Sequence, residues 1–154
     1  MKNTSTKFNF GRGAWTFLAA YIAITILAFG LYLILAAIMG VPTSDPFDIR
    51  NDPAYTLAEK LYPILNIFVW VGFAWIYFKK IVNPTIKQAW QLGLFWLAIS
   101  VPLDLIYFVL IPNPLQVSAY GFYVEQFPWI YLTYIVVAGS PALYVWLKQI
   151  CSKK

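Results

Sequence analysis

The chain has 154 residues, of which 61% are hydrophobic and only 11% are charged. Soluble domains carry about a quarter charged residues, so this composition excludes an ordinary water-soluble domain and favours an integral membrane protein. The formal net charge of +5 does not indicate a nucleic-acid-binding protein, because the basic residues lie at the ends of apolar segments rather than on a shared polar surface.

Four apolar segments are long enough to cross a bilayer, which takes about 20 helical residues. They span about 15–39, 61–78, 90–111 and 128–147. Little chain remains for another domain, so residues 1–154 are predicted to form one all-α membrane domain, an antiparallel bundle of four transmembrane helices. The first segment is longer than the apolar part of a signal peptide, and we expect it to be an uncleaved helix.

Charge at the helix ends predicts the topology. Basic residues without acids flank three helix ends: Lys2, Lys7 and Arg12, then Lys79, Lys80 and Lys87, then Lys148, Lys153 and Lys154. The connections at about 40–60 and 112–127 instead hold the acids Asp45, Asp48, Asp52, Glu59 and Glu125. The positive-inside rule therefore places both termini and the short connection 79–89 in the cytoplasm, with the other two connections outside. A bacterial cytoplasmic membrane is the expected location.

Prolines mark both helix starts and candidate hinges. Pro53, Pro84 and Pro128 are predicted to lie in the first turns of helices, where the missing N–H costs nothing. Pro102 and Pro141 fall inside predicted spans, where each removes a helical hydrogen bond. They are either hinges or static kinks.

Asp104 is the only acidic or basic residue inside a predicted span. Charged residues in membrane helices are costly and are by default candidates for function. Asp104 is expected about seven residues, or roughly 10 Å, from the outer end of its helix at 1.5 Å per residue. Ser100 and Tyr107 fall on the same helical stripe, which we expect to face the inside of the bundle.

The other helices offer polar side chains at a comparable depth. These are Asn66 with Tyr62, Tyr32, and Thr133 or Tyr134, with Lys60 near the mouth as a possible counter-ion. They predict an outward-facing polar pocket with Asp104 at its floor. Small residues gather in the opposite half, among them Gly72, Gly93 and Gly139, and predict close helix packing there. The aromatic connection after the third helix is expected to lie over the bundle mouth.

Two interpretations remain open for this polar layer. Its members either satisfy one another as interhelical hydrogen bonds, worth about 0.6–2 kcal/mol each in membranes, or form a functional site. The functional hypothesis is a transport-related protein, or one that binds an apolar or cationic ligand. The alternative is a non-enzymatic accessory, immunity or assembly subunit that docks a larger membrane partner or a second copy.

Catalysis is disfavoured. The sequence has no histidine, no evident second acid near Asp104 and no nucleophile with an adjacent base. With a lone cysteine, Cys151, and no histidine, neither a metal site nor another cofactor is expected. The expected partners are the lipid bilayer and, under the alternative, a membrane protein or a second copy of the chain, and no nucleic acid is expected.

Overall fold

A computed structural model describes residues 8–41, 52–112 and 116–152. The described residues contain helices and connections and no strand. Part of the charge argument rests on residues outside these ranges, namely Lys2, Lys7, Asp45, Asp48, Lys153 and Lys154.

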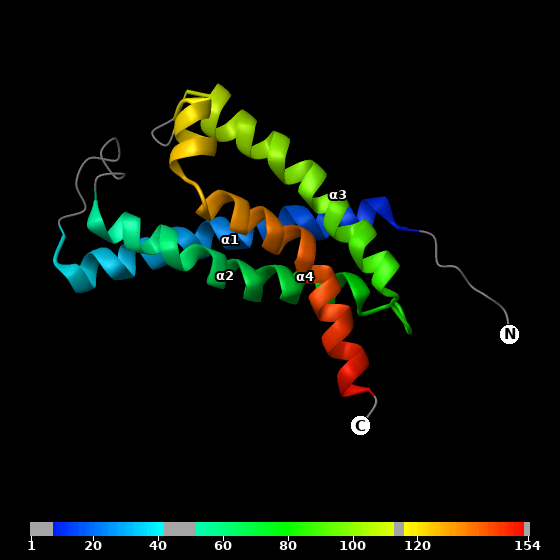
Figure 1. Cartoon of the computed structure of the whole chain (residues 1–154). Helices are drawn as coiled ribbons and strands as arrows, with labels where there is room; N and C mark the ends of the chain where they lie inside the picture. The colour runs from blue at the N-terminus through cyan, green and yellow to red at the C-terminus, as the bar shows by residue number, and fades with distance from the viewer. Residues whose placement is uncertain (1–7, 42–51, 113–115, 153–154) are drawn as a thin grey trace, which may run out of the picture.

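Four long helices confirm the predicted four-helix bundle (Figure 1). They are α1 (Phe10–Met39), α2 (Pro53–Phe78), α3 (Ile86–Asp104) and α4 (Trp129–Cys151). Two short π-helical segments, η2 (Leu105–Leu110) and η3 (Gly121–Glu125), follow α3. The spans Phe10–Met39, Pro53–Phe78, Ile86–Leu110 and Trp129–Cys151 are each long and apolar enough to cross a membrane.

The first two helices begin earlier than hydropathy predicts, because polar side chains cap them. The Asn9 side chain accepts from the Arg12 N–H at 2.9 Å, and that of Asp52 accepts from the Ala54 N–H at 2.7 Å. Pro53 is the first residue of α2, as predicted. Glu59 and Lys60 therefore lie inside α2 rather than in a connection, although they precede its apolar segment. Arg12, Lys87 and Lys148 likewise lie near the ends of the other three helices.

The last two helices begin slightly later than their prolines suggest. Thr85, not a residue before Pro84, caps α3: the Gln88 N–H donates to Thr85 Oγ1 at 3.2 Å, and the Thr85 N–H donates to Gln88 Oε1 at 3.0 Å. This reciprocal capping box fixes the start at Ile86. Pro128 is the cap residue of α4 rather than part of its first turn.

The helices pack in the spatial order α1, α2, α4, α3. Extensive contacts join α1 to α2, α2 to α4 and α4 to α3, whereas α1 and α3 touch over only a short stretch. Figure 1 shows α3 crossing α1 near the beginning of α1 and diverging from it toward η2. The bundle is therefore closed on three sides and open on the fourth, between α1 and α3.

A dense aromatic core fills the end of the bundle where α1 begins and α4 ends, here called the terminal end. Trp70 of α2 and Trp96 of α3 are almost fully buried, with ring centroids 5.2 Å apart, and Phe17 of α1 lies 5.5 Å from Trp70. The Trp96 indole Nε1 donates to the Gly13 carbonyl at 2.9 Å, which satisfies its polar group. This core joins three helices and fixes α3 against α1 at this end.

The small residues of this half divide into two kinds. A Cβ added at Gly93 would overlap the carbonyl oxygen of Ala138, so α3 and α4 contact each other there through backbone. This close approach confirms the expectation for Gly93. A Cβ at Gly72 or Gly139 would meet nothing within 4 Å, so the expectation of close packing was wrong for these two.

Neither hinge candidate interrupts its helix. Pro102 is exposed within α3, and Pro141 is buried within α4. Two residues after Pro102, at the end of α3, the backbone changes from α-helix to the π-helix η2. Such local widening is common at functional sites. Here it begins immediately after Asp104.

A cavity around Asp104

A cavity of about 760 Å³ occupies the other end of the bundle, here called the loop end, where α1 leads to α2 and α3 to α4. Small-molecule sites usually measure about 300–1,000 Å³, so the volume suits a ligand. Side chains of α1, α2, α3, η2 and α4 line it, and Phe122 of η3 covers part of it. The wall is mostly apolar and aromatic, with a few polar groups.

Asp104 is the last residue of α3 and is 8% exposed. Its carboxylate oxygen Oδ1 accepts a hydrogen bond from the Tyr21 hydroxyl of α1 at 2.7 Å. Tyr21 also lines the cavity. The hydrogen bond thus joins α1 and α3 where the two helices begin to diverge.

Tyr21 was not predicted as a site residue, because its depth matches that of Asp104 only when the helices are inclined to one another. Tyr21 lies eighteen residues before Met39, the end of α1, which is about 27 Å of helix at 1.5 Å per residue. Asp104 lies near the end of its own helix as expected, six residues before η2 ends at Leu110, but its partner Tyr21 lies much farther from the end of α1. The inclination of α3 brings Asp104 next to a residue in the first half of α1.

Tyr134 of α4 contributes a second hydroxyl beside Asp104. This buried hydroxyl is near both Asp104 and Tyr123 but makes no hydrogen bond of good geometry with a described residue. Leaving a buried polar group unsatisfied costs about 1–3 kcal/mol. A polar group of a ligand, or water, placed between Tyr134 and Asp104 would remove this cost.

Other predicted polar residues line the same cavity but bond within their own helices. Asn66 accepts from Trp70 Nε1 at 2.8 Å and donates to the Tyr62 carbonyl at 2.9 Å. Ser100 donates to the Leu97 carbonyl at 3.3 Å, and Thr133 to the Trp129 carbonyl at 3.1 Å. These bonds connect no two helices. Mutual interhelical bonding therefore does not explain why these groups gather here.

Tyrosines surround the wider part of the cavity. Tyr32, Tyr62 and Tyr107 are all on its wall, as the sequence analysis placed them. The Tyr32 hydroxyl donates to Asp52 Oδ2 at 3.0 Å, which ties α1 to the start of α2. Lys60 is exposed and is not on the wall, so the structure does not bring this predicted counter-ion to the site.

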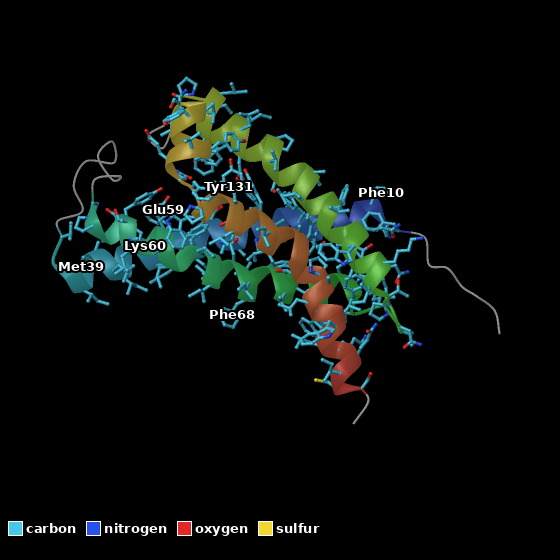
Figure 2. All side chains as sticks on the ribbon, viewed as in Figure 1. Phe10, Met39, Glu59, Lys60, Phe68 and Tyr131 are labelled. Carbon is cyan, nitrogen blue, oxygen red and sulfur yellow. The ribbon has the colours of Figure 1, made fainter. Side chains whose placement is uncertain are left out.

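Glu59, the residue before Lys60, does line the cavity. Figure 2 shows both residues near the start of α2. Glu59 was expected in a connection, and this expectation was wrong because α2 begins at Pro53. Extending the helical stripe of Asn66 and Tyr62 backwards by three residues would have identified Glu59.

An aromatic cover connects α3 to α4. Phe122 of η3 is 3% exposed and stacks on Phe108 of η2, with ring centroids 5.3 Å apart. The Val117 N–H donates to the Phe108 carbonyl at 2.8 Å, so the connection folds back on η2. Gln126 also reaches the cavity wall. The predicted aromatic cap thus lies over one side of the cavity.

The charged side chains on this wall, among the described residues, are both acidic: Asp104 and Glu59. Such a cavity favours a cation or a hydrogen-bond donor over an anion. The described residues contain no group of three or more Cys, Asp or Glu side chains that could hold a metal ion.

No protein-family model matches the chain, and no curated protein or solved structure is significantly similar to it. The functional argument therefore rests on the cavity itself.

Proposed function

We propose that this protein binds an apolar molecule with a cationic group in the cavity around Asp104. The observation that carries the proposal is the combination of a cavity of about 760 Å³ with two carboxylates and no lysine or arginine on the described wall. A largely apolar pocket with a few placed polar groups is the usual form of a small-molecule site.

The proposed orientation puts both termini in the cytoplasm, with the cavity end of the bundle facing outward. The support is the distribution of charge: Lys79, Lys80 and Lys87 lie between α2 and α3 or at the start of α3, at the terminal end. The acids Asp52 and Glu125 lie at the loop end. By the positive-inside rule the basic end is cytoplasmic, and we place the protein in a bacterial cytoplasmic membrane.

A binding site open to one side suits a receptor for a ligand or a component of a transport system. The dense core around Trp70 and Trp96 closes the terminal end, so we propose a site and not a continuous pore. A role as an accessory, immunity or assembly subunit is the alternative, in which Asp104 only stabilises the bundle.

The test compares the binding of benzylammonium to nanodiscs that contain wild type or Asp104→Asn, with empty nanodiscs as the background. We expect Asp104→Asn to weaken binding by about tenfold or more, because a hydrogen bond to a charged group is worth about 1.5–3 kcal/mol. Glu125→Gln is the matched control: it also removes one carboxylate, but Glu125 is exposed on η3 and is not on the cavity wall.

The two functions predict different results. Ligand binding requires that Asp104→Asn loses affinity while its helix content and unfolding transition stay close to those of wild type. Equal binding by wild type and Asp104→Asn would contradict the proposal. If Asp104 is purely structural, Asp104→Asn should lower the stability of the bundle, and wild type should not bind benzylammonium.

A further inference from the structure

The open side of the bundle determines how a ligand reaches Asp104. At the terminal end, the Trp96–Gly13 hydrogen bond and the contact of Phe95 with Phe10, at 5.6 Å between ring centroids, join α3 to α1. The Tyr21–Asp104 hydrogen bond joins them again at the level of the site. Beyond it α3 continues into η2 and diverges from α1 (Figure 1).

Three apolar side chains of α1 form one edge of this opening. Ile22, Ile26 and Phe29 line the cavity and yet are 52%, 66% and 59% exposed. On the opposite edge, Tyr107 of η2 lines the cavity and is 45% exposed. A side chain that is both on the wall and exposed lies where the cavity opens.

The surroundings of this opening are lipid. Ile22 and Ile26 lie near the middle of α1, a thirty-residue helix whose most apolar stretch has a mean hydropathy of 2.6. The middle of such a span lies in the hydrocarbon core of the bilayer. The cavity therefore opens sideways into acyl chains at these residues.

We propose that the ligand is a single-chain primary amine that enters from the bilayer through this opening. Its alkyl chain lies against Ile22, Ile26 and Phe29, and its ammonium group reaches Asp104 and Tyr134. This assignment rests on the proposed function and adds the route, the chain and the type of head group.

The polar groups explain the choice of a primary ammonium. Three N–H groups on one nitrogen can donate to the Asp104 carboxylate and to the buried Tyr134 oxygen together. The Tyr134 hydroxyl lies beside Asp104 and Tyr123 but makes no well-formed hydrogen bond with a described residue. A quaternary ammonium has no N–H and would leave Tyr134 unsatisfied, so dodecyltrimethylammonium should bind more weakly than dodecylamine.

The alkyl chain of the ligand accounts for the apolar side chains at the edge of the opening. An alkyl chain that moves from lipid into the opening exchanges one apolar environment for another, so it costs little and needs no polar partner. If the ligand has no alkyl chain, the acyl chains of lipids fill the opening instead. Dodecylamine therefore uses the whole site, whereas benzylammonium uses only the polar part.

The experiment narrows the opening with Ile26→Trp and measures both ligands in phosphatidylcholine nanodiscs, which contain no primary ammonium group. We expect Ile26→Trp to weaken dodecylamine binding by about tenfold, because a larger side chain in an occupied site costs about 1–3 kcal/mol, and to leave benzylammonium binding unchanged. Ile22→Trp, one helical turn away, should act in the same way. Ile34→Trp is the control, since Ile34 is exposed on α1 but is not on the cavity wall.

Several results would overturn the assignment. Unchanged dodecylamine binding in both Ile22→Trp and Ile26→Trp would show that the chain does not lie in the opening, while benzylammonium binding that depends on Asp104 would leave the proposed function intact. If Ile22→Trp and Ile26→Trp weakened the binding of both ligands equally, the tryptophan would obstruct the head-group site, and the assignment of the alkyl chain to the opening would lose its support. Competition by added phosphatidylethanolamine would identify a phospholipid as the occupant. Failure of both ligands to bind wild type would refute the proposed function and this inference together.

Discussion

At the scale of single residues, the Tyr21–Asp104 hydrogen bond decides how α1 and α3 meet. It is short, at 2.7 Å, and it joins two helices that share few other contacts. Its donor is a half-buried tyrosine, and its acceptor is 8% exposed. Both the cavity floor and the start of the lateral opening depend on it.

We expect Tyr21→Phe to lower the free energy of unfolding by about 0.6–1.7 kcal/mol, the range for interhelical hydrogen bonds in membrane proteins. Reversible unfolding in mixed micelles measures this difference. Tyr131→Phe is the matched control: Tyr131 is 43% exposed on α4 (Figure 2), and its hydroxyl should contribute nothing to stability. Equal losses in the two variants would show that the Tyr21–Asp104 bond does not stabilise the bundle.

The same pair shows what a sequence can and cannot reveal about a site. Asp104 was identifiable because an acid inside an apolar segment is costly, and Asn66 because it is an amide among apolar neighbours. Tyr21 was not, because tyrosine is common in membrane helices and its depth matches that of Asp104 only once α3 is inclined. Glu59 was missed for a simpler reason, the misplaced start of α2.

At the scale of helices, the local signals were strong enough to find each element and too weak to fix its ends. Hydropathy detects the part of a helix that lies in lipid, whereas caps such as Asp52 and Thr85 determine where the helix begins. Proline marks the neighbourhood of a helix start, as Pro53 and Pro84 show, but the adjacent capping side chain selects the residue.

A second prediction concerns helix packing, because the glycines of this chain differ in the space that surrounds them. Gly93→Ala should destabilise the bundle by about 1–3 kcal/mol, the usual cost of overpacking, since its Cβ would overlap the Ala138 carbonyl oxygen. Gly72→Ala and Gly139→Ala should be neutral or stabilising by up to about 1 kcal/mol, because alanine favours the helix and nothing obstructs it.

Unfolding in mixed micelles again measures these three variants, and the ordering matters more than the size. If Gly93→Ala were as stable as Gly72→Ala, the backbone contact between α3 and α4 would not exist as described. Gly93→Ser would then also be tolerated.

At the scale of the whole molecule, the number of helices and their membrane character followed from the sequence, whereas their spatial order did not. Four apolar segments with short connections require consecutive helices to run antiparallel, but either α3 or α4 can pack on α2. The choice of α4 follows from side chains far apart in the chain, such as Phe78 of α2 against Tyr144 of α4, with stacked rings 5.9 Å apart. That choice leaves α1 and α3 apart and creates the opening.

Orientation in the membrane is the property of the whole molecule that a single cysteine can test. Cys151 is exposed at the end of α4, at the terminal end, which the positive-inside rule assigns to the cytoplasm. In intact bacterial cells, a membrane-impermeant maleimide should therefore leave Cys151 unlabelled and should label it after permeabilisation. Cys151→Ser combined with Ala119→Cys moves the thiol to an exposed position beside η3, and this variant should be labelled in intact cells. Labelling of Cys151 but not of Ala119→Cys in intact cells would invert the topology and turn the cavity toward the cytoplasm.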